Sequence, residues 1–287
     1  MGMIFVSADK SRTPKMSHED IQAPPSPHVY WRSIVTFYAL ACAWSWPFFW
    51  LRDFHTQAFY SLPCPGFLKT SLIMWGPGLA ALVCWRLFRD RWPRRTNILG
   101  GHPWRALAFY FLPMAALAIP GIPMQPGTPP VHVLVFLLAI VGLFNTLGEE
   151  LGWRGFLQDA LRPLVWWKRF GLVGAMWCGW HFTNLFAGRD THEMLAYLAW
   201  YPLSCVLLSS LLGMAVERSR AVLVSVTLHA WVNMLFEFSG TGTTLVFACA
   251  IPFWIWMLWS WPTRISEFHT PRLVQSHRTI DEKRSVI

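Results

Sequence analysis

The feature that most constrains this chain is a series of about eight apolar stretches of helical length, separated by short polar loops. They run over residues 31–51, 66–88, 106–120, 131–162, 170–187, 194–216, 221–238 and 243–261. About 20 apolar residues in a helix span the hydrocarbon core of a bilayer. Only 14% of the residues are charged, against about a quarter in soluble domains. The sequence therefore predicts an all-α fold, a polytopic membrane helix bundle with about eight transmembrane helices.

Two of these stretches have features that predict a distorted helix. The third contains Pro113, which removes a backbone hydrogen bond and predicts a kink. The fourth is about 48 Å long at helical rise, which exceeds the hydrocarbon thickness of about 30 Å. Its final turns must leave the membrane or bend, and we expect a bend around Gly148, Gly152 and Gly155.

The loops between the stretches alternate in basic charge. The loops after the second, fourth, sixth and eighth stretches carry Arg89, Arg91, Arg94, Arg95, Arg105, Arg162, Lys168, Arg169, Arg218, Arg220, Arg264, Arg272, Arg278, Lys283 and Arg284. The opposite loops at 121–130 and 239–242 contain no Lys or Arg, and the loop after the fifth stretch contains one, Arg189. Because basic loops stay in the cytoplasm, the sequence predicts a multi-pass membrane protein with both termini cytoplasmic. These loops also explain the net charge of +9, so nucleic acid is not a predicted partner.

The chain is expected to divide into five parts. They are a disordered cytoplasmic N-terminal arm (1–30), N-terminal transmembrane helices (31–130), a core that carries the motifs described below (131–238), a last transmembrane helix (239–261) and a cytoplasmic tail (262–287). The arm is polar and lacks a secretory pattern. The six cysteines show no CxxC spacing, so neither a disulfide framework nor a cysteine zinc site is predicted.

Two adjacent carboxylates, Glu149 and Glu150, lie inside the fourth apolar stretch. A charge in the hydrocarbon costs a few kcal/mol or more, so each needs a partner, a proton or water. Arg154 follows Glu150 by four residues, which places both on one helix face. Glu149 is rotated by about 100° from Glu150 and has no such partner in the segment. Glu150 and Arg154 are therefore predicted to be a supporting pair, while Glu149 is left available for chemistry.

Two histidines lie deep in apolar stretches, at a depth similar to that of Glu149. By helical rise, His181 is about 16 Å and His229 about 12 Å from the predicted cytoplasmic ends of their helices. Glu149 lies thirteen residues before Arg162, where its own helix leaves on the same side. Three successive motif-bearing helices thus bring one carboxylate and two imidazoles to one level, which predicts a shared site in the cytoplasmic half of the bundle.

Three short motifs in this core resemble those of one protein family. Residues 149–154 read EELGWR, which matches the EExxxR signature of the CPBP family, the CAAX protease and bacteriocin-processing membrane proteins that include the Ras-converting CAAX endopeptidase. The family's FxxxH motif is similar to WCGWH at 177–181, and its HxxxN motif to HAWVN at 229–233. The resemblance covers roughly residues 131–238. Trp in place of Phe in the second motif is expected to affect packing and not chemistry.

Peptide hydrolysis needs a base for water, an acid for the leaving amine and donors for the oxyanion. The resemblance implies that Glu149 activates the water and that His181 helps to hold it. His229 and Asn233, one helical turn apart, are then the groups that bind the carbonyl oxygen. Glu149, His181 and His229 also make a three-ligand set for Zn²⁺ with an open fourth position. The sequence leaves both mechanisms open, one with zinc and one without a cofactor.

The predicted function is therefore that of an intramembrane endopeptidase. Its partners would be the lipid bilayer and a membrane-associated peptide or protein, which the resemblance extends to prenylated CAAX-type substrates cleaved near the cytoplasmic face. One alternative is a non-catalytic membrane binder, such as a bacteriocin-immunity or scaffolding protein. A transporter is the second, since intramembrane carboxylates and histidines also relay protons. The tryptophans beside the polar residues are expected to pack or to line a pocket, and these are Trp153, Trp177, Trp180 and Trp231.

Overall fold

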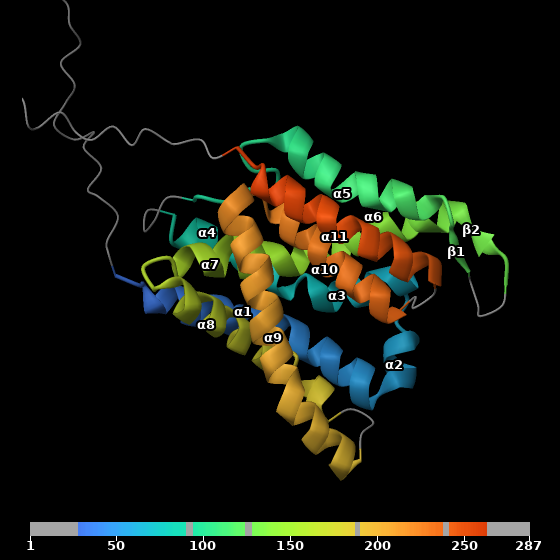
Figure 1. Ribbon diagram of the computed structural model, residues 1–287. Helices are drawn as coiled ribbons and strands as arrows, with labels where there is room; N and C mark the ends of the chain where they lie inside the picture. The colour runs from blue at the N-terminus through green and yellow to red at the C-terminus, as the bar shows by residue number, and fades with distance from the viewer. Residues whose placement is uncertain (1–27, 90–93, 124–127, 187–189, 238–240, 263–287) are drawn as a thin grey trace, which may run out of the picture.

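The computed structural model describes residues 28–89, 94–123, 128–186, 190–237 and 241–262, and the chain is an all-α membrane helix bundle (Figure 1). Most of the predicted N-terminal arm and almost all of the predicted tail lie outside the described residues. The α-helices are α1 (Trp31–Phe54), α2 (Thr56–Tyr60), α3 (Gly66–Met74), α4 (Gly76–Leu87), α5 (Pro103–Ala118), α6 (His132–Glu150), α7 (Gln158–Ala160), α8 (Trp166–Trp180), α9 (Thr191–Ser219), α10 (Val222–Glu237) and α11 (Thr241–Trp259). A π-helix, η2 (Leu151–Leu157), follows α6, and a 3₁₀ turn, η3 (Phe182–Leu185), follows α8.

Each predicted apolar stretch corresponds to one helix or to consecutive helices. Within the described residues, three helical segments are long and apolar enough to cross a membrane, namely Trp31–Phe54, His132–Ala160 and Thr191–Ser219. The pair Leu68–Met74 and Gly76–Leu87, which meet at a bend of 46°, is a fourth candidate. The positions of the helices therefore follow the sequence pattern, whereas the number of membrane crossings remains a prediction.

A short pair of strands joins α5 to α6, in the loop that is predicted to face away from the cytoplasm. Strand β1 (Ile122–Pro123) pairs antiparallel with β2 (Pro130–Val131), with Ile122 opposite Val131. Helix α5 itself continues through Pro113. Proline is tolerated in membrane helices where neighbouring groups satisfy the freed backbone carbonyl, so the helix persists at the position where the sequence predicts a kink.

Large apolar side chains cover the outside of several helices. Helix α9 crosses the bundle with its N-terminal end projecting past its neighbours (Figure 1). Seven large apolar residues of α9 are 40–61% exposed. They are Leu195, Leu198, Trp200, Leu203, Leu207, Leu211 and Met214. Soluble monomers rarely expose such continuous apolar surface. The face therefore suits contact with lipid.

The bend between α3 and α4 packs closely against the junction of α6 and η2. A Cβ atom added at Gly148 would lie 2.9 Å from the Cα of Trp75, and one at Gly152 would lie 2.7 Å from the carbonyl carbon of Pro77. Small residues let membrane helices approach at such short range. These two glycines thus allow close packing beside the adjacent carboxylates, and the helical segment continues past them to Ala160.

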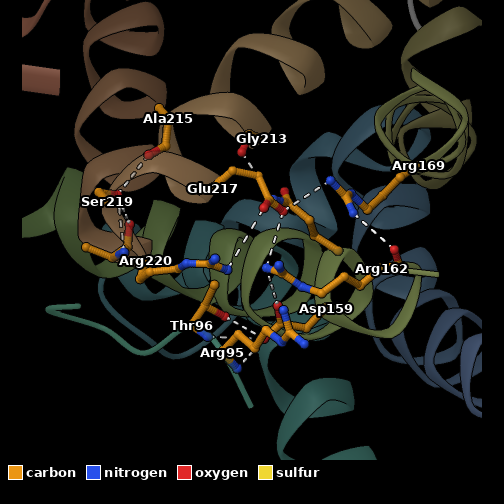
Figure 2. Close-up of polar contacts among 12 residues, drawn as sticks. Arg95, Thr96, Asp159, Arg162, Arg169, Gly213, Ala215, Glu217, Ser219 and Arg220 are labelled. Carbon is orange, nitrogen blue, oxygen red and sulfur yellow. Dashed lines mark hydrogen bonds and ion pairs between the residues drawn. The ribbon is translucent and has the colours of Figure 1, made fainter. Parts of the chain in front are cut away.

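Charged residues at the ends of α7, α8 and α9 form a group that we call the Glu217 cluster, made up of Asp159, Arg162, Arg169, Glu217 and Arg220 (Figure 2). Glu217 Oε1 lies 3.4 Å from Arg162 Nη2 and 3.3 Å from Arg169 Nη2. Its other oxygen, Oε2, lies 3.9 Å from Arg220 Nη1. Burial and the neighbouring Arg162 lower the pKa of Arg220, and the Glu217 carboxylate opposes them. Glu217 therefore holds three guanidinium groups together at one end of the bundle.

Asp159, the second carboxylate of the Glu217 cluster, fixes the chain that precedes α5. Its Oδ2 accepts hydrogen bonds from the backbone N–H groups of Arg95 at 3.0 Å and Thr96 at 3.2 Å, and from the Thr96 hydroxyl at 3.0 Å. Its Oδ1 accepts from Arg162 at 3.3 Å. Each carboxylate of the cluster thus has several donors, and together they join four segments of the chain (Figure 2).

Candidate active site

The candidate site begins where α6 changes into the π-helix η2. Glu149 and Glu150 are the last two residues of α6, and they are only 3% and 0% exposed. The seven residues LGWRGFL that follow form η2, which contains Arg154. π-Helical segments are rare and often occur at functional sites. Two carboxylates are therefore buried at a local irregularity of the longest motif-bearing helix.

Glu150 is paired with two positively charged or chargeable groups. Its Oε1 accepts a hydrogen bond from Arg154 Nη1 at 2.9 Å, and both side chains are fully buried. This confirms the pair predicted from the i, i+4 spacing. The same Oε1 lies 2.9 Å from Nδ1 of His229 on α10. Because a carboxylate can only accept, Nδ1 of His229 carries the proton in this contact. The other ring nitrogen, Nε2, remains available to bind another group.

Glu149 has a different and simpler environment. Its Oε2 accepts a hydrogen bond from the indole Nε1 of Trp177 on α8 at 2.9 Å. Within the part of the chain that the structure describes, no further hydrogen bond or ion pair reaches the Glu149 carboxylate. The indole N–H is a neutral donor. Glu149 is thus a buried carboxylate without a guanidinium directly on it.

Trp177 contacts Glu149 and both histidines, whereas the sequence predicted only packing or a pocket wall for it. Its ring centroid is 5.8 Å from that of His181 and 5.3 Å from that of His229, and both contacts are edge-on. The guanidinium carbon of Arg154 lies 4.9 Å from the ring centroid. The signal in the sequence was Trp at the position where the second motif has Phe, because Trp adds an N–H donor that Phe lacks.

The remaining motif residues, His181 and Asn233, differ in burial and in hydrogen bonding. His181 is buried at the end of α8, where its Nδ1 lies 3.2 Å from the carbonyl oxygen of Trp177. Asn233 is exposed on α10, one turn beyond His229, and no hydrogen bond to its side chain is found among the described residues. Glu149 and the two histidines are thus linked through Trp177, and the carboxylate bonded to His229 is Glu150.

The residues as they stand do not fit the zinc site that the sequence left open. Within the described residues, no three His, Cys, Asp or Glu side chains are grouped so that they could hold a metal ion. Nδ1 of His181 is bonded to a backbone carbonyl and Nδ1 of His229 to Glu150. These bonds leave Nε2 of each ring available, as in metal-binding histidines, so the misfit rests on the grouping of the side chains, and no metal is assigned to the site.

Taken together, these features define an all-α membrane protein with a polar site buried among its helices. Residues 131–235 match the family model described as type II CAAX prenyl endopeptidase Rce1-like. The CAAX prenyl protease 2 of Methanococcus maripaludis is 28% identical to this chain over 108 residues, which are 35% of this chain and 38% of that protein. The chain therefore aligns with well under half the length of this relative.

The matched segment contains all three motifs and all six predicted site residues. The match of residues 131–235 to the Rce1-like CAAX prenyl endopeptidase model confirms the resemblance inferred from the motifs. Helices α1 to α5 lie outside the match. The junction of α3 and α4, at Trp75 and Pro77, packs against Gly148 and Gly152 beside the two carboxylates.

Proposed function

We propose that this protein is an intramembrane endopeptidase in which Glu149 is the base that activates water. The observation that carries the proposal is the contrast between the two adjacent carboxylates. Glu150 is neutralised by Arg154 and bonded to His229, whereas Glu149 is held by one neutral donor. A buried carboxylate without a paired cation is suited to take a proton. The family of the matched segment supports the same reaction class.

The proposed reaction is a direct attack of water on the scissile carbonyl. Glu149 takes a proton from water as the water oxygen bonds to the carbonyl carbon, and the carbonyl oxygen becomes an oxyanion. The carbon–nitrogen bond then breaks, and the proton held by Glu149 passes to the leaving amine. His181 helps to hold the water. These steps leave a carboxylic acid and an amine, and they restore Glu149 as a carboxylate.

His229 and Asn233 are the proposed donors to the oxyanion. Because Nδ1 of His229 is bonded to Glu150, the ring can present Nε2 to the substrate. When the ring is protonated, Nε2 becomes a donor, and the Glu150 carboxylate compensates its charge. The exposed Asn233 lies one turn further along α10, where its amide can donate to the same oxygen. Preorganised donors of this kind commonly supply a large part of the catalytic effect.

The proposed substrate is a membrane-associated protein with a C-terminal CAAX-type sequence that carries a prenyl group. The support is the family of residues 131–235 and the name of the archaeal relative. The apolar outer face of α9 provides a surface along which a lipid-modified chain can approach from the bilayer. The proposed site of cleavage is the cytoplasmic half of the membrane, because the basic loops are predicted to lie on that side.

The test of this function is turnover by the purified full-length protein in liposomes. Two peptides with the same CAAX sequence are supplied, one farnesylated and one carrying an unmodified cysteine, and the products are identified by mass spectrometry. The proposal predicts release of the C-terminal tripeptide from the farnesylated peptide. Cleavage of both peptides alike would remove the prenyl requirement. Binding without turnover would favour the alternative of a non-catalytic membrane binder. Loss of activity on chelation, with recovery when zinc is added, would contradict the metal-free mechanism.

The membrane orientation is tested separately. Reporters placed after Ile287 and near Arg94 should both report cytoplasm, whereas a reporter at Gly127 should report the opposite side. The reason is the asymmetry of Lys and Arg between alternate loops. A cytoplasmic signal at Gly127 would contradict the proposed topology with about eight spans and both termini cytoplasmic.

A further inference from the structure

We propose that Trp177 is a positioning residue for Glu149, and that its indole N–H holds one carboxylate oxygen so that the other faces the water to be activated. This inference rests on the proposed function, and it adds a residue that the motif comparison treats as packing. The hydrogen bond from Trp177 Nε1 to Glu149 Oε2 measures 2.9 Å and joins α8 to α6. Trp177 is only 5% exposed, so no bulk water competes for this donor.

The direction of the indole N–H is set by the neighbours of the ring. Two imidazoles, those of His181 and His229, meet the indole edge-on at interplanar angles of 66° and 78°. The guanidinium of Arg154 lies over the ring at 4.9 Å from its centroid. A bicyclic ring confined from several sides has one accessible rotamer in a close-packed interior. Trp177 can therefore fix Glu149 as a rigid group and does not need to reorganise during the reaction.

The neutrality of this donor is what makes it suitable. An arginine or lysine at this position would form a charge-assisted bond with Glu149 and would lower its tendency to take a proton. A phenylalanine, the residue of the family's motif, would leave the carboxylate without this donor. The indole N–H thus orients Glu149 and stabilises its charged form less than a cationic donor would. Arg154 donates to Glu150, and its guanidinium carbon lies over the indole ring.

The chain offers a matched control in Trp231. It is fully buried on α10, the helix that carries His229, and its indole Nε1 has no hydrogen-bond partner among the described residues. Its ring contacts Phe247 and Trp254. Replacing either tryptophan by phenylalanine removes the same atoms from a buried site. Only the change at Trp177 also removes a bond to Glu149.

The experiment measures kcat, KM and the melting temperature of Trp177→Phe, Trp231→Phe and wild-type protein with the farnesylated peptide. If the bond contributes as much in the transition state as bonds to charged groups contribute to folding, its loss lowers the rate about tenfold or more. We expect kcat of Trp177→Phe to fall by about tenfold with KM unchanged, and Trp231→Phe to keep kcat within about twofold. Benzothienylalanine at position 177 keeps the bicyclic shape but lacks the N–H, so it should show the same fall in kcat.

The result that overturns the inference is wild-type kcat in the benzothienylalanine variant, or equal losses in the two phenylalanine variants. If wild-type protein shows no turnover, the proposed function fails and the positioning role fails with it. The hydrogen bond itself can still be measured by melting. Trp177→Phe should lower the melting temperature by more in the wild-type background than in Glu149→Met, which has no acceptor, because both backgrounds lose packing but only the first loses the bond; equal shifts would show that the bond contributes nothing.

Discussion

The Glu217 cluster and the candidate site use the same residue types in opposite ways. In the Glu217 cluster, one carboxylate lies within ion-pair distance of three arginines, and Asp159 accepts from two backbone N–H groups and a hydroxyl. In the site, Glu150 is similarly neutralised, but Glu149 beside it has a single neutral donor. Each carboxylate that holds segments together lies within ion-pair distance of an arginine, and the one that we propose as the base does not.

This difference shows how a membrane protein can keep one buried carboxylate reactive while it pairs the others. An ionised group in the bundle interior is costly unless it is paired. In this protein Arg154 pairs with Glu150, whereas Glu149 accepts a hydrogen bond from the neutral indole N–H of Trp177. Glu149, the buried carboxylate without a paired cation, lies in residues 131–235, the segment that matches the protease family model.

The largest expected effect on stability is that of Glu150→Gln. Removing one member of a buried pair leaves Arg154 uncompensated, which costs about 3–5 kcal/mol. The same change takes the partner from His229, so activity should fall as well. Glu150→Gln combined with Arg154→Gln should recover part of the stability but none of the activity. Thermal melting and peptide turnover of the three variants check this, and recovery of both properties together would contradict it.

A smaller effect on stability is expected from Gly152→Ala, which tests the close packing of η2 against Pro77 beside the site. The new Cβ would lie 2.4 Å from Pro77 Cβ and 2.7 Å from its backbone carbonyl, and overpacking of this kind costs about 1–3 kcal/mol. Gly171→Ala on α8 is the control, since nothing lies within 4 Å of its Cβ position, and it should gain about 0.5–1 kcal/mol. Equal melting temperatures for the two variants would show that the close approach at Pro77 is not a constraint.

The smallest expected loss is that of Glu217→Gln in the Glu217 cluster. Its side chain is 24% exposed, so solvent screens the repulsion among the arginines that remain, and we expect a loss of about 1 kcal/mol. Activity per folded molecule should stay at the wild-type level, because no residue of this cluster touches Glu149 among the described contacts. A large fall in kcat with unchanged melting would mean that the Glu217 cluster takes part in the reaction.

The helices and the pairing of Glu150 with Arg154 could be predicted from the sequence because their signals are local. Apolar length predicts each helix, and the spacing of Glu150 and Arg154 predicts their pair. The bond between His229 and Glu150 could not be predicted, since it joins residues 79 positions apart. Depth along each helix placed both carboxylates near both histidines, but the choice between the carboxylates depends on side-chain rotamers and on the packing of α6 against α10.

The role of Trp177 and the Glu217 cluster show the same limit. The Trp177 bond to Glu149 spans 28 positions and two helices, and the motif treats that position only as aromatic. The arginines of the Glu217 cluster were interpreted as loop charges that set the orientation. That Arg162, Arg169 and Arg220 surround one carboxylate depends on how α8 and α9 end beside each other. Contacts of this kind follow from tertiary packing and not from local pattern.

The central claim is that Glu149 is the working carboxylate, and Glu149→Gln tests it most directly. Glutamine keeps the shape of the side chain and an oxygen that can accept from Trp177, but it is not a base. The account predicts melting close to that of the wild type, with kcat on the farnesylated peptide lower by at least about 100-fold, the low end for loss of a general base. An active Glu149→Gln beside a folded but inactive Glu150→Gln would contradict it and exchange the roles of the two glutamates.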